Sequence, residues 1–182
     1  MPLLNSISTP YAEALLQVVD QRQETDQVAK EAKDLLEIWQ SSPELRAAFS
    51  SPVIESEAKR NLLVTLFGND ITPTFLTLLK VLADRQRIAI FDAVLDRFLE
   101  LYREQRGIAL ARITSASPLS EQQQQALHAK VLAVAGTDKV EFDLHIDPAL
   151  IGGFVVSVGS QVIDASLAGQ VRRLGLALAK AG

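Results

Sequence analysis

Two different spacings of apolar residues divide this chain and limit what it can fold into. From about residue 5 to residue 106 the apolar residues recur every three or four positions, and Ser, Pro, Gly and Asn interrupt them at short intervals. This spacing predicts six consecutive amphipathic helices. After Gly107 the apolar residues alternate with smaller or polar ones, as is typical of β-strands. The predicted fold is therefore α+β, with a helical bundle over residues 1–106 and a small α/β domain over residues 107–182.

Breaking and capping residues predict where the helices of the bundle begin and end. Thr9 and Pro10 suit the first turn of the first helix, because proline needs no donor there. Gly68 and Asn69 suit a left-handed end of the fourth helix. The other predicted helices cover about residues 24–40, 43–49, 72–85 and 88–106, and the fourth covers about residues 55–67.

The second domain is predicted to contain three strands and two helices. Ser120 and Gln123 have the spacing of a capping box, which predicts a helix that runs to about Ala135 and ends at Gly136. The predicted strands cover residues 108–114, 140–146 and 154–158, and a last helix covers residues 166–180. The order strand, helix, strand, strand, helix favours a small layered domain.

Composition excludes several classes of function. The chain has 182 residues, of which 48% are hydrophobic, so each domain has enough apolar residues for a core. Its net charge of −4 argues against a nucleic-acid partner, because phosphate binding requires clustered Lys and Arg. No apolar run approaches the roughly 18 residues that span a bilayer, so membrane association is expected only through partners.

The sequence contains no pattern that indicates catalysis, a cofactor or a metal. There is no cysteine, and the two histidines, His128 and His145, are isolated. We expect His128 on a helix surface and His145 on a strand surface. The glycines near residue 152 lack the lysine of a phosphate-binding loop. An enzyme that used the second domain would need converging polar or nucleophilic residues, and none cluster at suitable spacing.

A specific pattern lies near the carboxyl end of the chain. Its residues are Leu144, Ile146, Asp147, Leu150, Ile151, Gly152, Gly153, Phe154, Val156, Val158, Gly159, Val162, Ile163, Asp164, Ala165, Ser166 and Gly169. This pattern resembles the signature of ATP synthase delta subunits and of the mitochondrial oligomycin-sensitivity-conferring protein. The segment from Pro10 to Leu15, and Ser51, Pro52 and Val53 with Lys59, look like the same family, so the resemblance covers nearly the whole chain.

The chemistry of this signature favours a structural role over ligand binding. Gly152 and Gly153 permit a tight turn with positive φ. Asp164 and Ser166 can accept hydrogen bonds from amides at the start of the last helix. Gly169 lies within that helix, where close packing of helix on sheet is expected to compensate for its low helix propensity. The structural signature is thus Asp147, Gly152, Gly153, Gly159, Asp164, Ser166 and Gly169.

The resemblance implies a non-catalytic stator subunit of F-type ATP synthase. Residues 1–106 would bind the amino-terminal helices of the alpha subunit on the catalytic head, and residues 107–182 would bind the b-type subunits of the peripheral stalk. The subunit would resist rotor torque during proton-driven ATP synthesis and would need no cofactor. It would be a peripheral membrane protein on the cytoplasmic (or stromal) face of the plasma or thylakoid membrane.

The expected partner site is a groove between the first and fifth helices. Its predicted lining is Tyr11, Ala14, Leu15 and Val18 with Leu78, Val81 and Leu82. An amphipathic helix of a partner would fit such a groove, but the same apolar stripes could equally form the core of the bundle. The basic pairs Arg85 with Arg87 and Arg172 with Arg173 suit solvated faces or contacts with acidic helices. An alternative function is a helical adaptor or regulatory module unrelated to ATP synthase.

Overall fold

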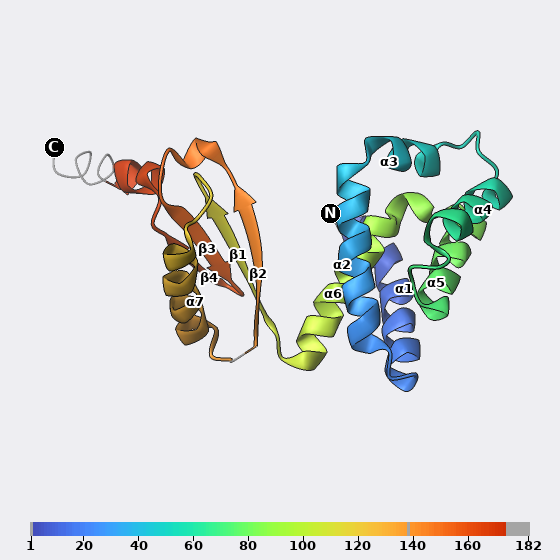
Figure 1. The fold of residues 1–182 in the computed structure, drawn as a ribbon, viewed down its shortest axis with the longest axis horizontal. Coiled ribbons are helices and arrows are strands. Elements are labelled where there is room, and N and C mark those ends of the chain that lie inside the picture. Colours follow the sequence, from blue (N-terminus) through green and yellow to red (C-terminus); the bar gives the residue numbers. More distant parts are fainter. Residues whose placement is uncertain (1, 138, 174–182) are drawn as a thin grey trace. The chain divides into compact units, whose positions relative to one another are not determined.

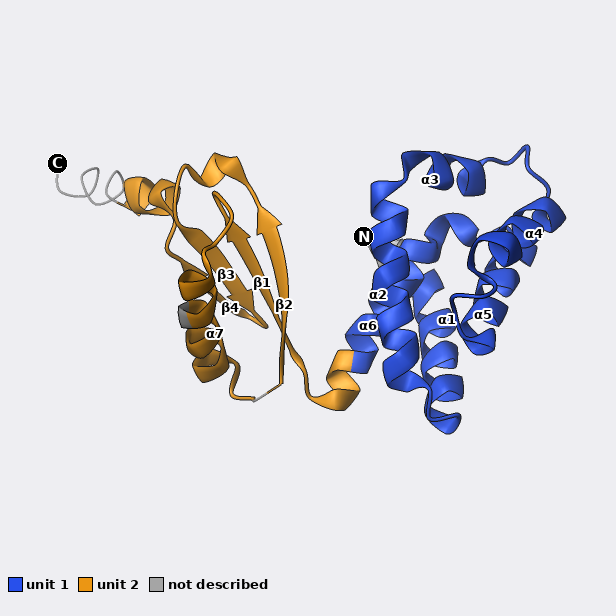
Figure 2. Ribbon diagram, viewed as in Figure 1, with its two compact units in different colours: residues 1–102 blue, residues 103–182 orange. Residues whose placement is uncertain are grey.

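The computed structural model describes residues 2–137 and 139–173, in which most helices precede the strands (Figure 1). The chain divides into two compact units, unit 1 over residues 1–102 and unit 2 over residues 103–182 (Figure 2). The predicted α+β fold class is confirmed. The division falls within the last helix of the bundle, a few residues before the Gly107 at which the apolar spacing changes.

Unit 1 is built from the predicted amphipathic helices, which pack around one apolar core. Within this core, the ring centroid of Trp39 lies 5.1 Å from that of Phe91 and 6.0 Å from that of Phe49. The elements are α1 (Pro2–Gln21), α2 (Thr25–Ser41), α3 (Pro43–Ser50), α4 (Ser56–Phe67), α5 (Pro73–Asp84), the 3₁₀ turn η1 (Ile88–Ile90) and α6 (Phe91–Arg106).

Two details of the predicted helix ends are wrong. Pro10 lies inside α1, whose first residue is Pro2. Its side chain is solvent-exposed, so the proline ring does not pack in the core. Gly68 caps α4 in a right-handed conformation with φ −60°, and its backbone N–H bonds the carbonyl of Val64. The end of α4 therefore does not have the left-handed conformation that we predicted from Gly68.

A polar contact between helices fixes the start of α5. The Oε2 atom of Glu31, on α2, accepts hydrogen bonds from the backbone N–H of Thr72 at 2.9 Å and from its hydroxyl at 3.1 Å. The Thr72 hydroxyl in turn accepts the backbone N–H of Phe75, which caps the helix. The position of α5 is therefore set by specific bonds as well as by apolar packing.

Unit 2 is a four-stranded sheet with one face covered by a helix (Figure 1). The strand order is β2-β1-β3-β4, with β1 and β2 parallel and the other pairs antiparallel. Leu127 and Val131 of the covering helix pack in a core with Ile113 and Val156 of the sheet. The elements are β1 (Ala109–Ser115), α7 (Glu121–Ala135), β2 (Val140–Ile146), the 3₁₀ turn η2 (Pro148–Leu150), β3 (Phe154–Val158) and β4 (Gln161–Asp164).

Most elements of unit 2 follow the sequence prediction, but one strand was missed. Ser120 and Gln123 form the predicted capping box, and Gly136 ends α7 in the left-handed conformation. The strand β4 was not predicted, because it is only four residues long and has exposed apolar neighbours, Val162 and Ile163, in place of an alternating pattern. The last predicted helix is present over residues 167–173, and its remainder to residue 180 lies outside the described residues.

None of the helices in the described residues combines the length and the apolar character that crossing a bilayer requires.

Candidate functional site: a groove between α1 and α5

Helix α1 carries two apolar stripes with different environments. Ala12 and Val19 are fully buried in the core of unit 1. Ile7 and Val18 lie on another side of the helix and retain 41% and 40% of their surface exposed. A helix that only packed in the bundle would need one stripe, so the second stripe is available for another contact.

Helices α1 and α5 lie side by side (Figure 1). The second stripe of α1 and residues of α5 line an open groove between them. The groove encloses about 940 Å³. It extends along α1 from Ser6 to Arg22, the residue directly after the helix, a length of about 24 Å at 1.5 Å per residue. Its lining consists of Ser6, Ile7, Pro10, Tyr11, Ala14, Leu15, Val18, Arg22, Pro73, Thr74, Thr77, Leu78, Val81 and Arg87.

The structure brings most of the predicted groove residues together. Tyr11, Ala14, Leu15, Val18, Leu78 and Val81 all line the cavity. Leu82 does not, because it follows Val81 by about 100° around α5 and is fully buried in the core. The lining residues that were not predicted are Ser6, Ile7, Pro10, Arg22, Pro73, Thr74, Thr77 and Arg87. Arg22 could have been predicted to lie on the groove side, because it follows Tyr11 by eleven residues, about three helical turns.

Polar contacts mark two places along the groove. The guanidinium of Arg87 donates a hydrogen bond to the Tyr11 hydroxyl at 2.9 Å and lies over the Tyr11 ring, 5.8 Å from its centre. Near the other end, Arg22 donates to the Thr74 hydroxyl at 3.0 Å, and that hydroxyl donates to Glu24 at 2.8 Å. Both arginines are exposed but held by these bonds.

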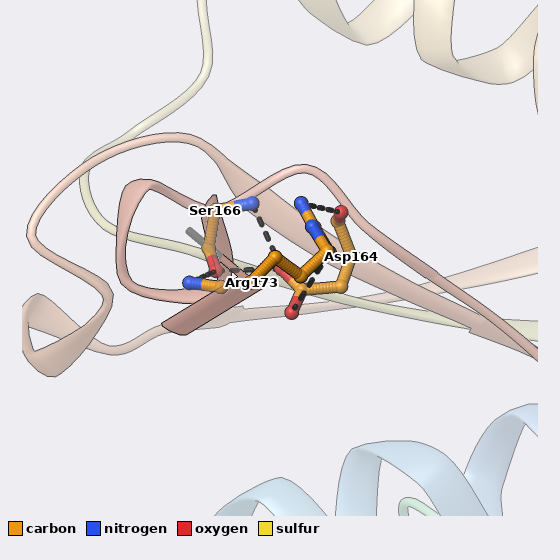
Figure 3. A network of polar contacts seen from close by, with 4 residues as sticks. Asp164, Ser166 and Arg173 are labelled. Atoms are coloured by element: carbon orange, nitrogen blue, oxygen red, sulfur yellow. Dashed lines mark hydrogen bonds and ion pairs between the residues drawn. The ribbon is translucent and has the colours of Figure 1, made fainter. Parts of the chain in front are cut away.

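In unit 2, Asp164 and Ser166 organise the start of the last helix (Figure 3). A carboxylate oxygen of Asp164 accepts the backbone N–H of Ser166 at 2.9 Å and its hydroxyl at 2.6 Å, and the Ser166 hydroxyl accepts the backbone N–H of Gly169 at 3.0 Å. These bonds from Ser166 hold the pKa of Asp164 below its ordinary value of 3.8, and the nearby Arg173 adds to the effect.

The glycines of this region have different reasons to be glycine. Gly153 has φ +79°, a conformation that disfavours any side chain. It also abuts the backbone of Ala165, which leaves no space for a Cβ. Gly152 has no positive φ, contrary to the prediction, and instead leaves room for Leu167, whose Cδ1 would lie 2.7 Å from an added Cβ. The other positive φ in this segment belongs to Ile151, two residues before Gly153, at +65°.

Gly169 and the remaining signature residues also serve local structure. A Cβ on Gly169 would collide with the carboxylate of Asp164, so this glycine makes room for the capping side chain. We predicted that close packing of the helix on the sheet would require glycine at this position, but the atoms nearest to an added Cβ belong to Asp164. Asp147 accepts the backbone N–H of Ala149 at 2.9 Å, and Gly159, with φ +56°, turns the chain between β3 and β4.

Both histidines lie on the protein surface, as predicted. His128 is exposed on α7 and its ring lies 4.8 Å from that of Phe142, and His145 is exposed on β2. Within residues 2–137 and 139–173, no three His, Cys, Asp or Glu side chains gather in a way that could hold a metal ion.

The described chain combines a helical bundle that has an open apolar groove with a small α/β domain. The chain belongs to the ATP synthase delta (OSCP) subunit family, whose profile matches residues 7–178. The resemblance inferred from the residues between Leu144 and Gly169 is thereby confirmed.

Several relatives share most of the sequence. The chain is 67% identical over 180 residues to ATP synthase subunit delta of Prochlorococcus marinus (strain MIT 9303), with 99% of each chain covered. It is 63% identical over 182 residues to the organellar chromatophore ATP synthase subunit delta of Paulinella chromatophora, with 100% of each covered. A chain of the Toxoplasma gondii mitochondrial ATP synthase hexamer has the same fold, with a TM-score of 0.77 at 22% identity over 94% of this chain and 96% of that chain.

Membership of this family establishes the general role of the chain. It is a structural, non-catalytic subunit of ATP synthase and part of the stator that links the catalytic head to the peripheral stalk. It associates with the membrane peripherally, through the complex.

Proposed function

We propose that the groove of unit 1 binds an amino-terminal helix of the ATP synthase alpha subunit and that unit 2 binds the b-type subunits of the peripheral stalk. The subunit would do so on the cytoplasmic (or stromal) face of the plasma or thylakoid membrane. Two contacts on one chain connect the head to the stalk and oppose the torque of the rotor during proton-driven ATP synthesis.

The observation that carries the first half of this proposal is the groove itself. Its volume of about 940 Å³ and its length along α1 suit one amphipathic helix of several turns. Ile7, Val18 and Val81 are each about 40% exposed there, so a partner helix would remove apolar surface from water. Because the core of unit 1 holds α1 and Glu31 holds the start of α5, the groove is formed before a partner arrives.

The apolar surface of unit 2 supports the second half. The strand register places Leu144 opposite Ile113 and Ile163 opposite Val156, so these residues share the face of the sheet that α7 covers. Leu144 is nevertheless 53% exposed and Ile163 is 41% exposed. The apolar face therefore extends beyond the area that α7 covers, and it offers surface for a stalk helix.

A titration tests the groove assignment. A synthetic peptide with the amino-terminal sequence of the alpha subunit is titrated into the full chain and its Kd is measured by calorimetry. Ala14→Asp and Val81→Asp should weaken the complex by roughly 2–4 kcal/mol, because the new charge loses water when the helix binds. Gln17→Asp, which changes an exposed α1 residue outside the groove lining, is the matched control and should bind normally.

The result that contradicts the proposal is equally definite. If Ala14→Asp and Val81→Asp keep the circular dichroism spectrum of the native chain and bind the peptide with unchanged Kd, the alpha subunit does not occupy this groove.

A further inference from the structure

The charges that line the groove have one sign. Among the described residues of its lining, the charged ones are Arg22 and Arg87. The chain as a whole carries a net charge of −4, so this local excess of positive charge runs against its overall composition. Between the two arginines lies an apolar floor that includes Leu15 and Leu78.

The spacing of the two arginines matches the repeat of an α-helix. Arg87 is bonded to Tyr11, and Arg22, directly after the end of α1, follows Tyr11 by eleven residues. Eleven residues of an α-helix make just over three turns and about 16 Å. The backbone N–H of Arg22 still bonds the carbonyl of Val18, so Tyr11 and Arg22 lie on the same side of the helix. A partner helix that lies along the groove would therefore meet the arginines at positions about three turns apart on one of its own faces.

Both guanidinium groups are held in place and retain donors. Arg87 uses one N–H on the Tyr11 hydroxyl, and Arg22 uses one on the Thr74 hydroxyl. A guanidinium has five N–H groups, so further donors are available for a carboxylate. Glu24 lies near Arg22, where it accepts the Thr74 hydroxyl proton. Because these bonds restrict the arginine side chains, less conformational entropy is lost when a partner binds.

We infer that the groove recognises an acidic amphipathic helix with two carboxylates about three turns apart, which pair with Arg22 and Arg87 and set the register of the bound helix. This inference rests on the proposed function, since it specifies the partner of the same groove. A neutral helix would remove water from the arginines without replacing its hydrogen bonds, and a basic helix would be repelled.

Designed peptides separate this inference from the groove assignment. Each is an acetylated and amidated amphipathic helix of about 18 residues with the same apolar stripe. The first has glutamates three turns apart at the edges of the stripe, the second has glutamines there, and the third has the two glutamates moved to the opposite face. Their Kd values for the full chain are measured by calorimetry at low and high salt.

The first peptide should bind roughly three- to tenfold more tightly than the other two at low salt, and this advantage should shrink at high salt. Arg22→Gln and Arg87→Gln should each remove part of the advantage of the first peptide over the second. Arg85→Gln is the matched control, since Arg85 is exposed at the end of α5 but does not line the groove.

The other outcomes are distinct. If the first and second peptides bind equally well and the arginine variants do not differ from the native chain, the carboxylate pairing is wrong while the groove still holds a helix. If none of the peptides binds, the inference and the groove assignment both fail.

Discussion

Gly153 and Gly159 both have positive φ, but their surroundings differ. A Cβ on Gly153 would strike the backbone of Ala165 and Ser166, whereas a Cβ on Gly159 would meet no atom within 4 Å. Backbone atoms in a hydrogen-bonded turn cannot move aside easily, and here the Ala165 N–H is bonded to the carbonyl of Phe154. The two positions therefore separate the effect of backbone strain from that of lost space.

Gly159→Ala should lower the stability of unit 2 by about 1–2 kcal/mol through strain alone. Gly153→Ala should lower it by more than about 3 kcal/mol, because steric overlap adds to the strain. The chain has one tryptophan, Trp39, and it lies in unit 1, so its fluorescence reports that unit while far-ultraviolet circular dichroism reports both. In urea titrations the circular dichroism transition should shift and the fluorescence transition should not. Equal effects of the two substitutions would contradict the packing at Gly153.

Asp164 makes the start of the last helix sensitive to acid. Its pKa is lowered by the hydrogen bonds from Ser166, so its contribution to stability is fully present above the ordinary value of 3.8 and is lost as pH falls through the lower pKa of the folded state. Ser166→Ala removes the hydroxyl bond and should raise the pKa of Asp164 toward 3.8, as measured by NMR titration of the carboxyl carbon. Ser160→Ala, in the β3–β4 turn, is the control. An unchanged Asp164 pKa in Ser166→Ala would show that the bond is absent in solution.

At the scale of single elements, the sequence predicts what depends on local chemistry. The capping box of Ser120 and Gln123 and the ends of β2 and β3 follow from neighbouring residues and are present as predicted. The strand β4 could not be predicted, because its four residues are stabilised by pairing with β3 and not by a pattern of their own. The start of α1 was predicted wrongly because proline is common in the first turn of a helix, whereas Pro10 lies inside α1.

The groove illustrates what periodicity leaves open. Ile7, Tyr11 and Val18 have the spacing of a helix face, but periodicity does not distinguish a face in the core from a face that awaits a partner. That distinction depends on how many neighbours surround α1, which is a property of the whole bundle. Val81 and Leu82 show the same limit, since they are adjacent apolar residues of α5 and only Leu82 is in the core.

At the scale of the molecule, the proposed function requires both units at once. The core of unit 1 is made from residues 1–102, so a fragment of residues 1–106 should fold and keep the Trp39 fluorescence transition of the full chain. In membranes that carry only this fragment, the head should still hydrolyse ATP, but ATP-driven proton pumping should fall, because the link to the stalk is broken. Head retention and pumping are measured together. Normal retention with normal pumping would show that unit 2 is not the stalk-binding half.

The sheet of unit 2 has a consequence for the subunit before it is assembled. Its strand order leaves β2 and β4 at the edges of the described sheet, where backbone groups can pair with another chain. Glu141 and Asp143 place charged side chains along β2, where they pair with Arg103 and Arg112 at 3.6 Å, and β4 is four residues long and ends in Asp164. Charged side chains on an edge strand disfavour pairing with another chain, and β4 is too short to template a long ladder. We therefore expect these edges to limit self-association of the free subunit, even though Leu144 and Ile146 are exposed beside them.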